Sequence, residues 1–265
     1  MNQHLSFRSG NPALNSKVFK NFSESSSNTM TLNGAVNKTG ISLLLLLLFG
    51  CFGFYFTLNS GVKVVGINGD TVITNMSSSL MILGFIVGFI LALVTIFKKH
   101  LSPYTVPAYA IFEGLALGAI SAFFSAMYDG IVFQAVLITS SIFFTLLFLY
   151  KTRIIKPTEN FKLGIAAATG GIFIVYIINM LMSFFGNGLP VMDINNASIY
   201  SIGFSLVVVV IASLNLVLDF DFIEEASEMG VPKYMEWYGA FGLMVTLVWL
   251  YLEILRLLAK LNSRR

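Results

Sequence analysis

Seven long apolar segments, separated by short polar stretches, dominate the pattern of the chain. Each is 18 to 23 residues long, which at about 1.5 Å of rise per residue is enough to cross the roughly 30 Å hydrocarbon core of a bilayer. The segments do not alternate apolar and polar residues, so the pattern excludes a transmembrane β-barrel. It predicts seven transmembrane helices, at residues 41–58, 78–97, 107–127, 131–150, 163–185, 199–218 and 237–259.

The composition supports an all-α integral membrane protein. Of the 265 residues, 56% are hydrophobic and 11% are charged, whereas soluble domains carry about 25% charged residues. Residues 1–40 are polar and include a Ser/Asn-rich stretch at 21–28, so we expect a disordered tail there. No cleavable signal peptide is expected, because the first apolar run begins at Ile41. The membrane domain is predicted at 41–261, followed by a basic tail at 262–265.

The distribution of basic residues predicts a cytoplasmic amino terminus. The tail and the loops on its side of the membrane hold eleven basic residues, whereas the opposite loops hold Lys63 alone. The eleven are Arg8, Lys17, Lys20, Lys38, Lys98, Lys99, Lys151, Arg153, Lys156, Lys162 and Lys233. Four more basic residues at the end of the last segment would emerge outside, unless that segment is re-entrant. We favour the full span, with an external carboxyl terminus.

Several function classes find little support in the residues. The single cysteine, Cys51, lies in an apolar run, which leaves no intrachain disulfide and no thiolate cluster. His4 and His100 are far apart and outside the apolar segments, so neither a histidine metal site nor a Ser/His/Asp arrangement can be assembled. We expect no enzyme activity and no resident cofactor. No interleaving of basic and aromatic residues suggests nucleic acid.

The charged residues inside the predicted helices are the candidate functional residues. Asp219 and Asn215 are four residues apart, so they share one face of a helix, which must point toward protein. A carboxylate in hydrocarbon costs about 2.5 to 3.5 kcal/mol, which makes Asp219 a functional candidate. Glu253 is another, either paired with Arg256 one turn later or acting as a proton or cation site.

Two further acidic features are weighed as parts of a pathway. Glu113 lies near the start of the third segment, so it could be a snorkelling or capping residue or part of a pathway. Asp221 belongs to an acidic cluster in the predicted loop between the sixth and seventh segments, with Glu224, Glu225, Glu228 and Glu236. Such a cluster is most simply a solvated surface, but it can also concentrate cations at the mouth of a pore.

Small residues mark expected sites of close helix packing. In the third segment Gly114, Gly118 and Ala122 recur every four residues, and in the fifth Gly164 and Ala168 precede Gly170 and Gly171. Close packing is the favoured interpretation, with flexibility along a pore as the alternative.

The positions of Asp219 and Glu253 along their segments limit whether the two side chains can touch. Asp219 lies at the end of its segment, whereas Glu253 is sixteen residues beyond Trp237, or about 24 Å along a straight helix. They can touch if the sixth helix extends to about Ile223 and the seventh begins nearer Phe241, or if the last segment is broken.

A set of local motifs resembles the Bax-inhibitor superfamily, also called the transmembrane Bax inhibitor motif family, and most closely its bacterial branch. The motifs cover most of residues 8–261: RSGNPAL at 8–14, VNKTG at 36–40, FEGLALGAISA in the third segment, ATGGIF in the fifth, NLVLDFDFIE in the sixth and KYMEWYGAFGLMVTLVWLYLEILRLL at the end. The resemblance implies a seven-helix bundle whose last helix is central, in the bacterial inner membrane.

The resemblance also implies a function and its residues. Proteins of this family show a pH-sensitive calcium leak that depends on two acids, which match Asp219 and Glu253 here as a proton- and cation-sensing pair. Position 253 departs from the more usual aspartate, and the predicted second helix lacks the family's basic partner, for which Arg256 is a candidate substitute. We expect a pH-sensitive leak for Ca²⁺ or another cation, with Asn215, Glu113 and Asp221 as further pathway candidates. The alternative is a non-transporting regulator that binds a membrane-bound protease.

Overall fold

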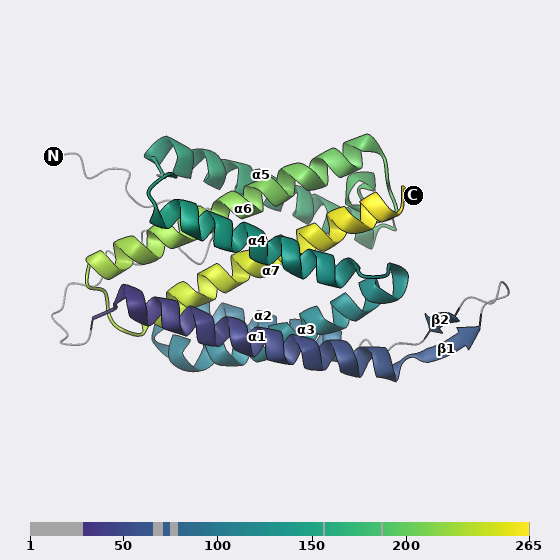
Figure 1. The fold of residues 1–265 in the computed structure, drawn as a ribbon, viewed down its shortest axis with the longest axis horizontal. Helices are drawn as coiled ribbons and strands as arrows, with labels where there is room; N and C mark the ends of the chain where they lie inside the picture. Colours follow the sequence, from purple (N-terminus) through teal and green to yellow (C-terminus); the bar gives the residue numbers. More distant parts are fainter. Residues whose placement is uncertain (1–28, 66–70, 75–78, 156, 187, 265) are drawn as a thin grey trace. The chain divides into compact units, whose positions relative to one another are not determined.

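The computed structural model describes residues 29–65, 71–74, 79–155, 157–186 and 188–264, which form seven long helices (Figure 1). All seven are long and apolar enough to cross a membrane, so the predicted fold class is confirmed. A short antiparallel hairpin of β1 (Val62–Val65) and β2 (Thr71–Thr74) follows the first helix. The helices are α1 (Leu32–Ser60), α2 (Ser79–Phe97), α3 (Ser102–Met127), α4 (Ile131–Lys151), α5 (Glu159–Phe184), α6 (Ile199–Glu228) and α7 (Met235–Asn262).

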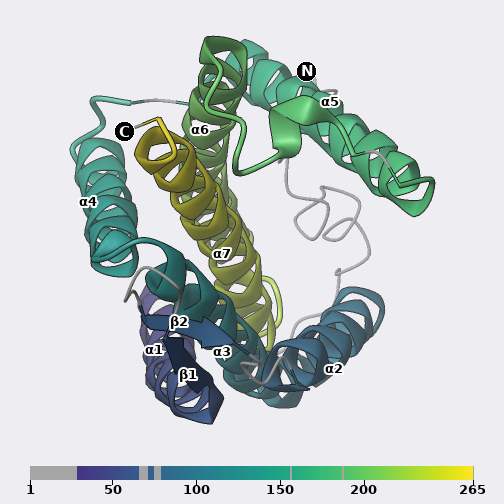
Figure 2. The same cartoon turned by 90° about the vertical axis from the view of Figure 1, so that its right-hand side faces the viewer.

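The chain divides into two compact units, and α7 contributes to both. The α1–α3 unit comprises Met30–Val132 together with Lys233–Phe241, at the start of α7. The α4–α7 unit comprises Phe133–Pro232 and Gly242–Arg265, with Thr29. In the α1–α3 unit, α3 packs against both α1 and α2 (Figure 2). The last helix thus supplies side chains to two separate cores.

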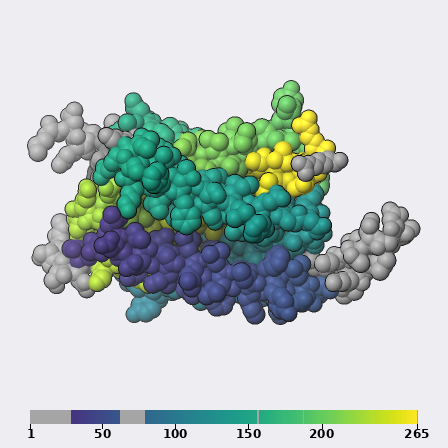
Figure 3. Space-filling view, viewed as in Figure 1, coloured from purple at the N-terminus to yellow at the C-terminus, as the bar shows by residue number. Residues whose placement is uncertain are grey.

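The outward faces of several helices are apolar, as a bilayer requires. Along α1, drawn in purple in Figure 3, the exposed side chains include Leu44, Leu48, Phe52 and Tyr55. Polar side chains of the same helix, such as Thr39 and Ser42, are buried. This inversion of the soluble pattern follows because lipid solvates apolar side chains and gives polar ones no hydrogen-bond partners.

Glycines bring α3 into close contact with its neighbours, as the small-residue pattern predicts. A Cβ atom at Gly118 would lie 2.1 Å from the carbonyl oxygen of Gly50 on α1, and one at Gly114 would lie 2.5 Å from that of Leu46. On the α2 side, a Cβ atom at Gly84 would lie 2.6 Å from the carbonyl oxygen of Phe112. The backbones meet because these positions have no side chain.

The same prediction is wrong for the fifth segment. A Cβ atom at Gly164, Gly170 or Gly171 would have no neighbouring heavy atom within 4 Å among the residues described. These glycines therefore mediate no close contact. Spacing alone cannot distinguish the two cases, because it does not reveal which face of a helix meets another helix.

Replacing Gly118 by alanine is expected to destabilise the protein by about 1 to 3 kcal/mol, because the added methyl group overlaps the α1 backbone and neither helix can move aside locally. Gly171→Ala is the matched control. It has open space around the new methyl group and gains helix propensity, so it should be neutral or slightly stabilising. Thermal unfolding in detergent measures both, and equal melting temperatures for the two variants would contradict the packing argument.

The first helix begins at Leu32, nine residues before the predicted start at Ile41. The correction has a local cause: Thr31 is the N-cap, and its hydroxyl accepts a hydrogen bond from the Gly34 amide. Residues 32–40 are therefore helical, contrary to the expectation of disorder there, whereas residues 1–28, including the RSGNPAL motif, lie outside the described residues.

Glu236, at the start of α7, also holds the first turn of α1. Its Oε1 accepts hydrogen bonds from the amide and the hydroxyl of Thr31, at 3.1 and 3.0 Å, and Lys38 Nζ lies 3.6 Å from its Oε2. The side chain is 1% exposed. The interpretation of Glu236 as part of a solvated acidic surface is therefore wrong, because its carboxylate is buried and binds the amino terminus of α1 and Lys38.

The last two helices differ from the predicted segments in length. The sixth continues ten residues beyond Leu218, to Glu228, and the seventh is one unbroken helix, Met235–Asn262. The acidic residues 221–228 are therefore helical and do not form a loop. A continuous α7 is what the full-span prediction requires, and it rules out a broken last segment in this structure. The side of the membrane on which each terminus lies stays a prediction.

Candidate functional site

The polar face of α6 points into protein, as predicted. Asn215 is 1% exposed and Asp219 is 0% exposed. The Asn215 Nδ2 donates to Thr169 Oγ1 on α5 at 2.8 Å and to the Ile211 carbonyl at 2.9 Å. An amide and a carboxylate are thus buried on one face of one helix, where no lipid reaches them.

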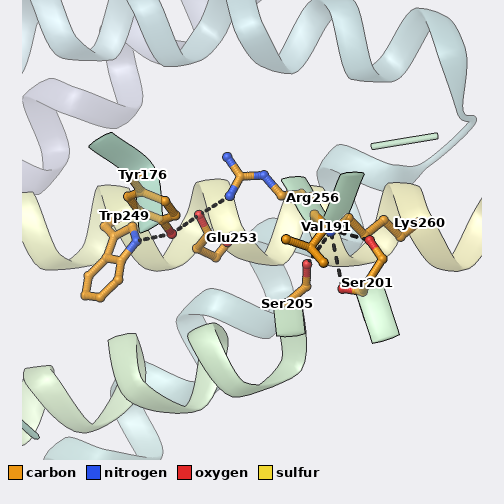
Figure 4. Close-up of polar contacts among 8 residues, drawn as sticks. All are labelled: Tyr176, Val191, Ser201, Ser205, Trp249, Glu253, Arg256 and Lys260. Atoms are coloured by element: carbon orange, nitrogen blue, oxygen red, sulfur yellow. Dashed lines mark hydrogen bonds and ion pairs between the residues drawn. The ribbon is translucent and has the colours of Figure 1, made fainter. Parts of the chain in front are cut away.

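Glu253 is the centre of a polar cluster on α7 (Figure 4). Its Oε1 accepts a hydrogen bond from the Tyr176 hydroxyl of α5 at 2.7 Å and from Arg256 Nη1 at 2.6 Å. Trp249 Nε1 in turn donates to the Tyr176 oxygen at 3.2 Å. Trp249, Glu253 and Arg256 share a face because they are spaced by four and three residues on a helix. Glu253 therefore has the intrahelical partner that its spacing from Arg256 allowed.

The second oxygen of Glu253 has a different environment. Oε2 is buried and has no hydrogen-bond partner within the described part of the chain, and the whole side chain is 2% exposed. An unsatisfied buried acceptor costs about 1 to 3 kcal/mol, and more when it is charged. A proton on this oxygen, or a cation bound to it, would remove that cost.

The contacts of α5 place Asp219 and Glu253 at different levels. Lys162 of α5 pairs with Asp221 of α6, and Thr169 of α5 contacts Asn215 of α6. The two helices therefore run antiparallel, and a step of seven residues along α5 corresponds to a step of six or seven back along α6. Seven residues further along α5, Tyr176 corresponds to about Val208 on α6. Because Tyr176 binds Glu253, Glu253 lies at the level of Val208. That is eleven residues from Asp219, or about 16 Å.

Contacts at the carboxyl-terminal end of α7 give an independent estimate of the separation between Asp219 and Glu253. Lys260 contacts Ser201 and Ser205 at the start of α6. Because α6 and α7 run antiparallel in this unit, Glu253, seven residues before Lys260, corresponds to residues 208–212. This again puts the two acids seven to eleven residues apart, or about 10 to 16 Å.

Both registers place Asp219 and Glu253 at different levels of the α4–α7 unit, so this conformation does not favour the predicted direct contact between them. Of the two conditions for contact, the first is met, because α6 extends past Ile223. The second fails, because α7 begins at Met235 and not near Phe241. The six additional helical residues at the start of α7 place Glu253 further from the turn between α6 and α7. A proton shared directly between the acids would need the helices to slide by several residues.

The acidic residues at the end of α6 form a separate ion-paired network. Lys162 Nζ, on a side chain that is 8% exposed, lies 2.5 Å from Asp221 Oδ2, 3.1 Å from Glu225 Oε1 and 3.7 Å from Glu159 Oε1. Glu224 pairs with Arg153 at 2.8 Å and accepts a short hydrogen bond from the Tyr150 hydroxyl. Asp221 is thus a partner of α5, and Glu228 is the one acid of α6 that is exposed.

The family comparison agrees with the fold and the motifs. The model of the family described as Bax inhibitor 1 like matches residues 11–263, nearly the whole chain. This protein belongs to the Bax inhibitor 1 like family. It is a multi-pass membrane protein, with the seven apolar helices that its family membership leads one to expect. No curated protein matches the chain.

Some features of this Bax inhibitor 1 like protein were not apparent from the sequence. Tyr176 and Trp249 looked like ordinary apolar residues, although a tyrosine or tryptophan in the middle of a membrane segment carries a hydrogen-bond donor that needs a partner. Lys162 was counted only as a basic residue outside the membrane. The sequence did contain a signal for this network. Lys162 follows Glu159 by three residues, which places the two on one helix face, and the end of the sixth segment is rich in acids.

Glu113 of this Bax inhibitor 1 like protein lies in the α1–α3 unit. It is 7% exposed, so the snorkelling alternative is wrong. A Cβ atom at Gly88 of α2 would lie 3.0 Å from its Oε2, so the absence of a side chain there makes room for the carboxylate. In the described residues, no three His, Cys, Asp or Glu side chains are grouped closely enough to hold a metal ion.

Proposed function

We propose that this Bax inhibitor 1 like protein is a pH-sensitive cation leak, with Ca²⁺ as the first ion to test. The observation that carries the proposal is the buried Oε2 of Glu253, which has no hydrogen-bond partner in the described chain. A second carboxylate, Asp219 of α6, is also buried. Buried acids in a membrane protein are expensive and mark proton or ion pathways by default.

The two carboxylates act as separate stations in this proposal. At low pH a proton on Glu253 makes the side chain neutral and removes a cation ligand. At higher pH the ionised carboxylate supplies oxygen atoms, which hard cations such as Ca²⁺ prefer. Arg256 and Tyr176 donate hydrogen bonds to the other oxygen of Glu253, which leaves Oε2 as the oxygen available to a proton or a cation. Flux is therefore expected to rise as pH rises.

Calcium flux into proteoliposomes that contain only this protein tests the proposal. The expected result is uptake that increases from acidic to alkaline pH and is absent from protein-free vesicles. Uptake that falls with rising pH would reverse the assigned roles of the protonated and ionised carboxylates. No uptake at any pH, with correctly reconstituted protein, would favour the non-transporting regulator.

A further inference from the structure

A buried lysine near the end of α7 has an unusual set of partners. Lys260 is 0% exposed, although it is only two residues from the end of its helix, where a lysine ordinarily extends its ammonium group into water. Its Nζ donates to the Val191 carbonyl at 2.6 Å, to Ser205 Oγ at 2.8 Å and to the Ser201 carbonyl at 3.3 Å. Figure 4 shows these groups converging on the ammonium.

All three donors of the ammonium are satisfied, and all three acceptors are uncharged oxygen atoms. Two carboxylates, Glu253 and the exposed Asp193, act on this charge only from a distance: Glu253 binds Arg256, and Asp193 accepts a hydrogen bond from the Asn195 amide. The direct contacts of the Lys260 ammonium are therefore carbonyl and hydroxyl dipoles, and no carboxylate forms a salt bridge with it in the described chain. Rings of such oxygens replace the hydration shell of a monovalent cation in selective channels.

The oxygens come from parts of the chain that the fold fixes in place. Ser201 and Ser205 are one turn apart near the start of α6, so the carbonyl of the first and the hydroxyl of the second point to the same place. Val191 lies in η3 (Pro190–Met192), a turn that packs against α6. Ser201 Oγ also donates to the Val191 carbonyl at 3.2 Å, which ties the turn to the helix.

We propose that Val191, Ser201 and Ser205 form a site for a small monovalent cation of ammonium size, and that the side chain of Lys260 occupies this site as a tethered cation. Because Arg256, one turn away, is paired with Glu253, the ammonium of Lys260 is the positive charge in this group of residues that has no carboxylate partner of its own. This charge repels a passing cation. Lys260 thus keeps this end of the α4–α7 unit closed to cations, a role that rests on the proposed leak.

Chemical rescue tests the site without reference to transport. Lys260→Ala removes the ammonium and leaves room, whereas Lys260→Met removes the charge but keeps the stem in place. Melting temperatures of the full chain in detergent are compared in methylammonium chloride and in tetramethylammonium chloride, which has no N–H donor. The alanine variant should melt several degrees below wild type and recover in methylammonium alone. Wild type and the methionine variant should not respond.

The outcomes separate the site from the leak. Absence of selective recovery in the alanine variant would overturn the cation site. If that variant does not fold, its purification in methylammonium should restore folded protein, and failure in both salts would also overturn the site. In proteoliposomes, Lys260→Met should raise Ca²⁺ flux several-fold, and equal flux in variant and wild type would overturn the closing role. Selective rescue together with no flux in any protein would support the site and remove the proposed leak.

Discussion

Replacing Lys162 by methionine is expected to lower the free energy of unfolding by about 3 kcal/mol. The ammonium lies within 4 Å of three carboxylates, and methionine fills its volume without its charge. Removing one partner of a largely buried ion pair typically costs about 3 to 5 kcal/mol, because the remaining charges are uncompensated. The lower end applies here, since Glu159 and Glu225 are partly exposed to solvent and their repulsion is screened.

The loss of unfolding free energy in Lys162→Met should be largest at neutral pH and smaller at acidic pH. At neutral pH the variant leaves Asp221, Glu225 and Glu159 ionised beside one another. Protonation at acidic pH relieves this repulsion in the variant and weakens the pairing in wild type, so the difference between the two proteins should shrink as pH falls. Unfolding in detergent at several pH values measures it. Lys151→Met, at an exposed position on α4, is the control, and an equal loss in both variants would show that the network contributes nothing.

Asp219→Asn and Glu253→Gln are each expected to remove much of the pH dependence of cation flux. The changes that the two substitutions cause in the logarithm of the flux should add in the double variant. Both substitutions keep the shape of the protonated side chain, so the fold should survive. The two positions lie about 10 to 16 Å apart along the helices, and substitutions separated by more than about 7 to 10 Å usually act independently. Directly paired acids would give a double variant little different from either single one.

Flux measured across pH for the two single variants and the double variant decides between these cases. Glu228→Gln supplies the control, because it makes the same chemical change at an exposed position of α6. Additive effects would support two separate stations. Strong non-additivity would show that the conducting conformation brings the two acids together, by a sliding of α6 against α7 that this structure does not contain. Unchanged pH profiles in both single variants would make the acids structural.

The local pattern of residues was sufficient for the membrane architecture. Length and apolarity of a segment decide whether it can cross a bilayer, because each helix must satisfy its own backbone there. The burial of Asn215 and Asp219 followed for the same reason: lipid offers a polar side chain no partner, so a polar face must meet protein. The close packing of Gly114 and Gly118 was predictable from spacing, although the identical argument failed for Gly170 and Gly171.

Tertiary structure decided which polar groups meet. Helix ends depend on caps and partners distant in sequence, such as Thr31 with Glu236, so apolar runs misplaced the start of α1 and the end of α6. Those few residues determine the register of α6 against α7, and each residue of shift moves a side chain by about 1.5 Å. That is why the sequence could nominate Asp219 and Glu253 but not tell that Glu253 meets Tyr176 and Arg256, or that Lys260 is enclosed by three oxygens from α6 and the turn before it.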